Sequence, residues 1–187
     1  MKPNIVCAFI TFGILVVVPT LQLCCQETEG IFEQPLLITS AGQNAEVQIA
    51  AVLAKRAGLN YTLSKQATAA DLGNMKTLVL VLGTSLKGLG AAGLDIDKER
   101  GRVIALITAA QKTQIPLFCL HLGGETRRGQ QTDDLVAEVI PLAKMLIVVK
   151  SGNSDGFFTK LCQSKNIPLI EVEKTADAQV PLQKAFK

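Results

Sequence analysis

His121 is the single histidine of the chain and its best candidate for proton transfer near neutral pH. Ser85 and Ser151 are candidate nucleophiles, and Asp155 is a candidate carboxylate to orient the imidazole. These residue types are compatible with a hydrolase or transferase that uses His121 as acid or base. Because no Gly-x-Ser-x-Gly sequence places a serine beside its base, a structural role for His121, as the hydrogen-bonded end of a strand, stays equally open.

Three cations point to a different chemistry, the binding of an anion. Lys87, Arg127 and Arg128 follow predicted strands, and a guanidinium group can bind a carboxylate or phosphate through two parallel hydrogen bonds. The two arginines also fit a solvated turn, and Asp155 also fits the first turn of a helix. We therefore rank a binding module first, an enzyme second, and a structural or partner-binding protein third.

Glycines concentrate in the same segments as these polar residues. Four connections hold ten of the fifteen glycines: residues 39–44, 83–95, 121–130 and 151–156. Glycine lets the backbone approach another molecule closely, so this concentration predicts one binding edge for a small polar or anionic molecule. The candidate ligand-binding residues are Ser40, Gly42, Gln43, Thr84, Ser85, Lys87, Gly88, Gly90, His121, Gly123, Gly124, Arg127, Arg128, Gly152, Asn153 and Asp155.

Two glycine-containing segments resemble cofactor loops without their usual surroundings. Residues 88–93 match Gly-x-Gly-x-x-Gly, but the charged segment 95–100 follows where an apolar helix should begin. Residues 40–45 are faintly like a flavodoxin phosphate loop, yet only Phe157 offers an aromatic wall nearby. No cofactor is therefore expected. With one histidine and no Cys-x-x-Cys pair, no metal site is expected either.

The elements that must position these residues alternate between strand and helix. Short apolar runs predict strands at 35–40, 61–64, 76–83, 115–122, 145–149 and 167–172. Helical periodicity and caps predict helices at 43–57, 95–110, 132–139, 154–165 and 175–186, with a long glycine-bearing connection over 83–95. This alternation predicts a three-layer α/β/α sandwich around a mostly parallel five- or six-stranded sheet, flavodoxin- or Rossmann-like, in a single domain over 31–187. Ligands bind such sheets outside the carboxyl ends of the strands, which is where the four connections lie.

Composition supports a folded domain and argues against a nucleic-acid binder. The chain has 187 residues, of which 48% are hydrophobic and 19% charged, so it can bury a core of its own. Its net charge of +3 comes with no block of like charges. The absence of tryptophan and the single tyrosine leave few aromatic platforms for stacking bases. No nucleic-acid partner is expected.

The first segment of the chain predicts export. Lys2 precedes the apolar run 5–18, so residues 1–25 are expected to be a signal peptide and the protein to be extracytoplasmic, either periplasmic or secreted. An uncleaved anchor and lipidation at Cys24 or Cys25 are the alternatives, and the membrane is expected to contact only this segment.

Two more cysteines lie in the predicted domain. Cys119 falls in a predicted strand and Cys162 in a predicted helix. Buried thiols behave as small hydrophobic residues, which is the interpretation we favour for both. A disulfide between them stays open as the alternative.

Several of these segments together resemble one uncharacterised family of exported bacterial proteins, the domain of unknown function DUF6305. The resemblance covers most of the chain after residue 25 and implies a bacterial, extracytoplasmic protein. The resemblance implies no particular activity and assigns no catalytic residue. It rests on Ser-Ala-Gly-Gln at 40–43, Lys-Gly-Leu-Gly-Ala-Ala-Gly at 87–93, His-Leu-Gly-Gly with Arg-Arg-Gly at 121–129, and Gly-Asn-Ser-Asp-Gly at 152–156.

Overall fold

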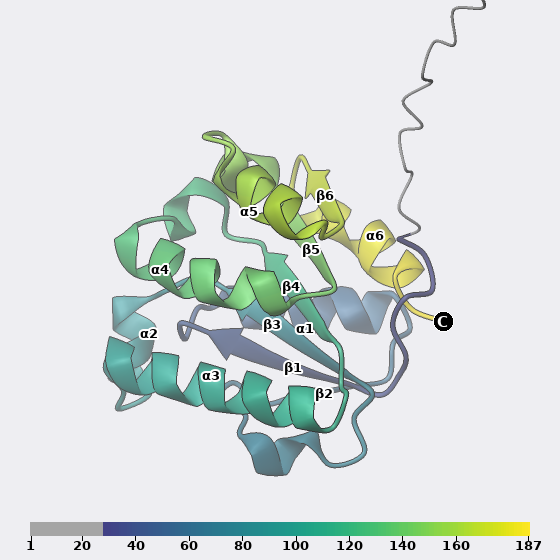
Figure 1. Ribbon diagram of the computed structural model, residues 1–187, viewed down its shortest axis with the longest axis horizontal. Helices are drawn as coiled ribbons and strands as arrows, with labels where there is room; N and C mark the ends of the chain where they lie inside the picture. Colours follow the sequence, from purple (N-terminus) through teal and green to yellow (C-terminus); the bar gives the residue numbers. More distant parts are fainter. Residues whose placement is uncertain (1–27) are drawn as a thin grey trace, which may run out of the picture.

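Six strands form one parallel sheet within residues 28–187, the part of the chain that the computed structural model describes (Figure 1). Each strand pairs in parallel with its neighbours. The predicted sandwich and its mostly parallel sheet are confirmed. The strands are β1 (Leu36–Ala41), β2 (Tyr61–Leu63), β3 (Thr77–Leu82), β4 (Leu117–His121), β5 (Met145–Val149) and β6 (Leu169–Val172).

The order of the strands is β2-β1-β3-β4-β5-β6, so the winding of the chain reverses between β1 and β3. From β1 the chain crosses to β2 on one side, and from β3 onward it proceeds to the other side. Such a reversal leaves a crevice at the carboxyl ends of the two strands, because their connections leave in opposite directions. β1 and β3 pair along their full length, from Leu36 opposite Thr77 to Ala41 opposite Leu82. The segments that follow Ala41 and Leu82 therefore start side by side.

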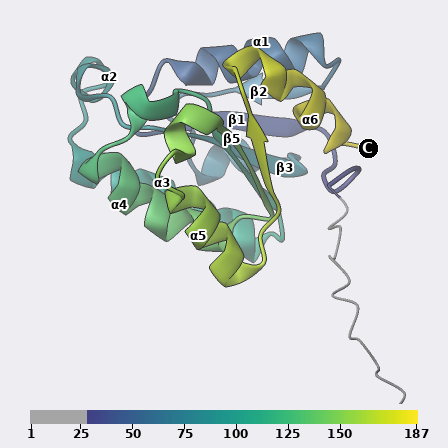
Figure 2. The same cartoon turned by 90° about the horizontal axis from the view of Figure 1, so that it is seen from above.

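Helices cover both faces of the sheet, as Figure 2 shows from above. One face packs against α1 (Glu46–Arg56) and α6 (Gln179–Lys184), and the other against α3 (Ile96–Lys112), α4 (Gln130–Val139) and α5 (Phe157–Lys165). Short 3₁₀ turns lie between these elements: η1 (Ala69–Leu72), η2 (Gly124–Arg127), η3 (Ile140–Leu142), η4 (Lys150–Asn153) and η5 (Thr175–Ala178).

The strands are apolar because helices bury them on both sides. Every residue of β1, β3, β4 and β5 is buried, whereas the edge strands β2 and β6 are partly exposed. Successive side chains alternate between two separate cores: Leu36 and Ile38 point to the α1 side, and Leu37 points to the α3 side. This explains the near-continuous apolar runs by which the strands could be predicted.

The structure corrects two boundaries. The connection over 83–95 contains a further helix, α2 (Leu86–Ala91), and α5 begins at Phe157 rather than at residue 154, since η4 occupies the preceding segment. The predicted signal peptide, 1–25, lies outside the described residues. Across residues 28–187, none of the helices has both the length and the apolar character that a membrane span needs.

The two cysteines of the domain are free and buried, Cys119 on β4 and Cys162 on α5. Burial raises the pKa of both thiols, that of Cys162 to about 11. They pack in the same apolar core, as the favoured interpretation expected.

Candidate functional site

A cleft with a volume of about 510 Å³ lies at the carboxyl ends of β1 and β3, where the winding of the chain reverses. We call it the switch-point cleft. Three segments line it together with Arg127: the loop after β1 (43–45), the loop after β2 (65–66), and α2 with its flanking residues, through Ser85, Lys87, Gly88, Ala91 and Ala92. Its size falls in the range of small-molecule sites.

The loop after β1 makes a tight turn that forms one wall of the cleft. Gly42 has a φ of +107° and Gln43 has a φ of +54°, so both lie in the region that side chains rarely adopt. A Cβ atom on Gly42 would lie 2.5 Å from the carbonyl oxygen of Gly83, and the carbonyl oxygen of Gly42 accepts a hydrogen bond from Ser85 N–H at 2.8 Å. An isolated bridge between Gln43 and Thr84 extends this contact. The turns after β1 and β3 are therefore fixed to each other.

The opposite wall is α2, which approaches the first wall backbone to backbone. A Cβ atom on Gly88 would lie 1.9 Å from the carbonyl oxygen of Gln43, so only glycine permits this approach. Ser85 caps the helix, because its Oγ accepts a hydrogen bond from Gly88 N–H at 3.1 Å. Gly90 is exposed on the same helix with open space around it. The first glycine of the Gly-x-Gly-x-x-Gly sequence thus serves helix packing.

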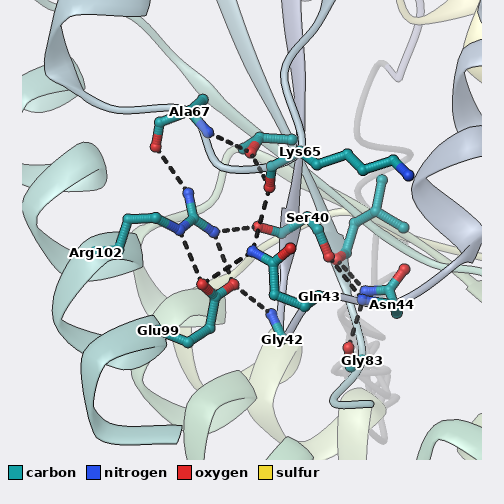
Figure 3. Close-up of polar contacts among 11 residues, drawn as sticks. Ser40, Gly42, Gln43, Asn44, Lys65, Ala67, Gly83, Glu99 and Arg102 are labelled. Carbon is teal, nitrogen blue, oxygen red and sulfur yellow. Dashed lines mark hydrogen bonds and ion pairs between the residues drawn. The ribbon is translucent and has the colours of Figure 1, made fainter. Parts of the chain in front are cut away.

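A buried ion pair lies beneath the loop after β1 (Figure 3). Glu99 of α3 is fully buried, and its Oε1 accepts a hydrogen bond from Gly42 N–H at 2.9 Å. Its Oε2 accepts one from Gln43 Nε2 at 3.0 Å. Arg102, one turn further along α3, donates to both oxygens. Burial raises the pKa of Glu99, but the hydrogen bonds from Arg102 and Gly42 outweigh burial and leave the pKa below its ordinary value.

Arg102 connects this cluster to the loop after β2. Its Nη1 donates to the carbonyl oxygen of Ala67 at 2.8 Å, and its Nη2 donates to that of Ser40. Gln43 Nε2 also donates to the carbonyl oxygen of Lys65, at 3.3 Å. The loops after β1 and β2 are therefore joined from inside the protein, and Figure 3 shows the Lys65 side chain extending away from this buried cluster.

Asn44 is a buried polar residue between the cleft and the sheet. Its Nδ2 donates to the carbonyl oxygens of Val81 and Gly83, both at 2.8 Å, and its backbone N–H donates to Ser40 Oγ. These bonds fix the amide so that Oδ1 has no hydrogen-bond partner. Thr84 Oγ1 is a second buried oxygen without one. Unpaired buried oxygens are uncommon and mark this part of the structure as unusual.

The charges at the cleft are mainly positive. Lys65 and Lys87 both line it, are both exposed, and have no ion-pair partner among the described residues. Arg127 also lines it, and its Nε donates to both carboxylate oxygens of Glu46 at 2.9 and 3.0 Å. Two ammonium groups are thus left uncompensated.

Arg128 points away from this group, although it follows Arg127 directly. Its guanidinium donates to the carboxylates of Asp133 and Asp155 and lies over the ring of Phe157, 4.6 Å from its centre. Arg128 does not line the cleft. The hydrogen bond from Arg128 lowers the pKa of Asp155 to about 2. The pair of arginines predicted to bind an anion is therefore divided, and only Arg127 is available at the cleft.

His121 is fully buried at the end of β4. Its Nδ1 lies 3.2 Å from the carbonyl oxygen of Leu82, and its Nε2 lies 3.1 Å from that of Gly124. The ring packs 4.8 Å from that of Phe158. Burial is the largest influence on the imidazole and lowers its pKa below the ordinary 6.5. The Asp155 carboxylate is bound by Arg128, and the ring nitrogens face backbone carbonyl oxygens instead of this carboxylate.

The remaining candidate residues pack between the loops after β4 and β5. A Cβ atom on Gly152 would lie 2.8 Å from the His121 ring, and one on Gly124 would lie 2.3 Å from Ser151 Oγ. Asn153 is tied to the first turn of α5, because its Oδ1 accepts a hydrogen bond from Phe158 N–H at 2.8 Å. Gly123 immediately precedes η2 and lies against the Arg127 side chain. The predicted set therefore falls into two groups.

One group lies at the switch-point cleft or in its walls, and the other forms a packed contact farther along the edge. The first contains Ser40, Gly42, Gln43, Thr84, Ser85, Lys87, Gly88 and Arg127; the second contains His121, Gly123, Gly124, Arg128, Ser151, Gly152, Asn153 and Asp155. Gly90 faces neither group.

Several residues of the site were not in the predicted set, among them Asn44, Ala45, Ala91 and Ala92, which line the cleft. Lys65 and Gln66 follow β2, which lies beside β1, so the order of the strands brings them to the cleft. Glu99 and Arg102 have the usual sequence appearance of charged residues in a helix, and only the packing of α3 reveals their role. No group of three or more histidine, cysteine or acidic side chains in residues 28–187 is arranged to hold a metal ion.

A family model described as a domain of unknown function, DUF6305, matches residues 33–186, so the chain belongs to this family. No curated protein matches it. Among solved structures, it is similar to AlinE4, a SGNH-hydrolase family esterase, with 12% identity, a TM-score of 0.29 and 76% of each chain covered. It is also similar to a GDSL-like lipase from Bacteroides thetaiotaomicron, with 12% identity, a TM-score of 0.35, and 73% of this chain and 66% of that one covered. At these scores the similarity carries no argument about activity.

Proposed function

We propose that this DUF6305 protein binds a small anionic molecule in the switch-point cleft without transforming it. The observation that carries the proposal is the position of Lys65, Lys87 and Arg127. They come from three separate segments and line one cleft at the reversal of the sheet. The carboxyl edge at such a reversal is where open α/β sheets bind ligands.

The groups in the cleft favour a carboxylate or phosphate ester of modest size. Lys65 and Lys87 carry charges that no described carboxylate balances, while Glu46 is already paired with Arg127. The amide of Gln66 and the backbone around Ser85 add polar groups beside apolar Ala91 and Ala92. A ligand with one anionic end and a small neutral body matches this lining.

The arrangement around His121 does not favour the alternative of a hydrolase or transferase. Its two ring nitrogens face backbone carbonyl oxygens, and the ring is inaccessible to solvent. Ser85 Oγ is engaged in capping α2. A nucleophile and its base need to lie within hydrogen-bond reach of each other and of a substrate, which this packing does not provide.

Thermal-shift measurements of the purified protein with phosphate, carboxylate, sugar and nucleotide ligands test the proposal. A ligand at a hundred times its dissociation constant stabilises the folded state by about 2.7 kcal/mol. We expect anions to raise the melting temperature, neutral sugars to leave it unchanged, and added NaCl to weaken the effect.

A double variant, Lys65→Met with Lys87→Met, locates the binding site. It should lose most of the anion-dependent shift, because it removes the two uncompensated charges of the cleft. Lys160→Met is the matched control, since Lys160 is an exposed lysine of α5 that does not line the cleft. An undiminished shift in the double variant would place the anion elsewhere, and the absence of any shift with anions would contradict the proposed function.

A further inference from the structure

We propose that Glu99 and Arg102 act together as a clamp that positions two walls of the switch-point cleft, so that ligand affinity depends on residues the ligand does not touch. This inference rests on the proposed function, because the clamp shapes the same cleft. Neither residue lines the cleft. Both belong to α3, an element outside the loops that they hold.

The hydrogen bonds of the clamp are directed at the loops. Glu99 accepts from the backbone of Gly42 and the side chain of Gln43, both in the turn after β1. Arg102 donates to the carbonyl oxygen of Ser40 at the end of β1 and to that of Ala67 after β2. One ion pair therefore fixes the spacing between the loops that carry Gln43 and Lys65.

The conformation of Gln43 shows what the clamp holds. Its φ of +54° is one that a residue with a side chain rarely adopts, and the turn needs a restraint to keep it there. Its Nε2 is held by Glu99 and by the carbonyl oxygen of Lys65. Because the backbone oxygen of Gln43 also faces Gly88, this restraint extends to the position of α2.

Stability alone does not require a buried ion pair at this position. Removing two charges from water is unfavourable, and apolar residues of similar volume often replace a buried pair without loss of stability. Glu99 is fully buried and the Arg102 side chain is only 11% exposed, so taking this pair out of water carries such a cost. The hydrogen bonds from this pair to the backbone of the loops give it a role, which is to hold the loops in one geometry.

The double variant Glu99→Leu with Arg102→Met separates positioning from stability. The control is Arg100→Met with Glu138→Leu. It removes an exposed ion pair that joins α3, the helix of the clamp, to α4. Three quantities are measured on the full chain: the urea midpoint, amide hydrogen exchange in the loops 42–45 and 65–67, and binding of inorganic phosphate by calorimetry.

We expect amides of both loops in the clamp variant to exchange about tenfold faster or more than the change in its urea midpoint accounts for, because local opening is easier. Phosphate should bind about tenfold more weakly, since the cleft is no longer preorganised. The control should match the wild type in both loops and in phosphate binding. Wild-type exchange in the two loops, or wild-type phosphate affinity, in the clamp variant would overturn the inference.

A wild-type protein that binds no phosphate would count against the proposed function and against the affinity part of the clamp, while the exchange data would still decide whether the pair positions the loops.

Arg102→Lys covers the case in which the double variant does not fold. It keeps the charge beside Glu99 but lacks the planar fork that reaches Ser40 and Ala67. Loops that exchange as in the wild type in this variant would likewise overturn the inference.

Discussion

His121 illustrates how burial changes the use of a residue suited to catalysis. Its imidazole is enclosed by Phe158 and by the carbonyl oxygens of Leu82 and Gly124. Placing a charge there would take it out of water, so the neutral ring is favoured and the pKa falls below 6.5. A neutral ring carries one N–H, so it can donate a hydrogen bond to only one of these two carbonyl oxygens at a time.

The titration of His121 provides a direct prediction. Because it is the single histidine, its proton resonances in an NMR titration are unambiguous. We expect a midpoint below 6.5 in the folded protein and about 6.5 in the same protein unfolded in urea. Since the unfolded chain binds the proton first, the stability that this residue contributes is complete above about pH 6.5 and is lost as the pH falls through the folded pKa. A folded midpoint above 6.5 would contradict the packing described for this ring.

Single residues of the site were harder to predict than their loops. Lys87 lies at the carboxyl edge of the sheet, in a segment that follows the apolar strand β3. Arg127 and Arg128 are adjacent, yet the end of η2 turns one to Glu46 and the other to Asp133. Such a difference depends on backbone angles at one position, and residue types alone do not determine it. The role of Glu99 in turn requires knowledge of which loop lies above α3.

At the scale of elements, α2 depends on one glycine. Gly88→Ala would place a methyl group against the carbonyl oxygen of Gln43, which requires α2 to move. We expect this change to lower the stability by about 1 to 3 kcal/mol, as overpacking generally does. The shift in urea midpoint measures it.

The same helix supplies the matched substitution. Gly90→Ala adds a methyl group where no atom lies within 4 Å, and alanine favours the helix over glycine by about 0.5 to 1 kcal/mol. This variant should therefore be slightly more stable than the wild type. Equal effects of the two substitutions would show that the close approach of α2 to Gln43 is absent in solution.

The strands were predictable and α2 was not, for a physical reason. Strands buried on both faces must be apolar throughout, which gives a strong signal at β3 and β5. α2 has the sequence Leu-Lys-Gly-Leu-Gly-Ala, and its two glycines disfavour a helix in isolation. The helix forms because Ser85 caps it and the side chain of its own Leu89 is buried against the domain. Tertiary contacts, rather than local preference, decide this segment.

At the scale of the whole molecule, alternation of strand and helix determined the layers but left the order of the strands open. Parallel strands joined by helices can be wound in more than one order, and neighbours are decided by the direction of each crossover. The observed order places β2 beside β1, which is why Lys65 reaches the cleft without having been predicted to do so. The fold class was therefore predictable, while the composition of the cleft was predictable only in part.

We separately propose that the protein is exported from the cytoplasm, because the apolar run 5–18 is typical of a signal peptide. We expect a tagged chain produced in bacteria to appear in the periplasmic fraction or the medium with about residues 1–25 removed, which cell fractionation and mass spectrometry measure. Deletion of residues 2–18 should retain the protein in the cytoplasm. Cytoplasmic, full-length protein from the intact sequence would refute export.

The reversal of winding between β1 and β3 has a consequence for how such a protein can diversify. Because two diverging crossovers create the hollow, its location follows from backbone topology and not from the charged side chains on its rim. Under the proposed function, exchanges at positions such as Lys65, Gln66 or Lys87 would change which anion is bound while leaving the scaffold untouched. A single architecture would thereby accommodate ligands that differ in charge or shape.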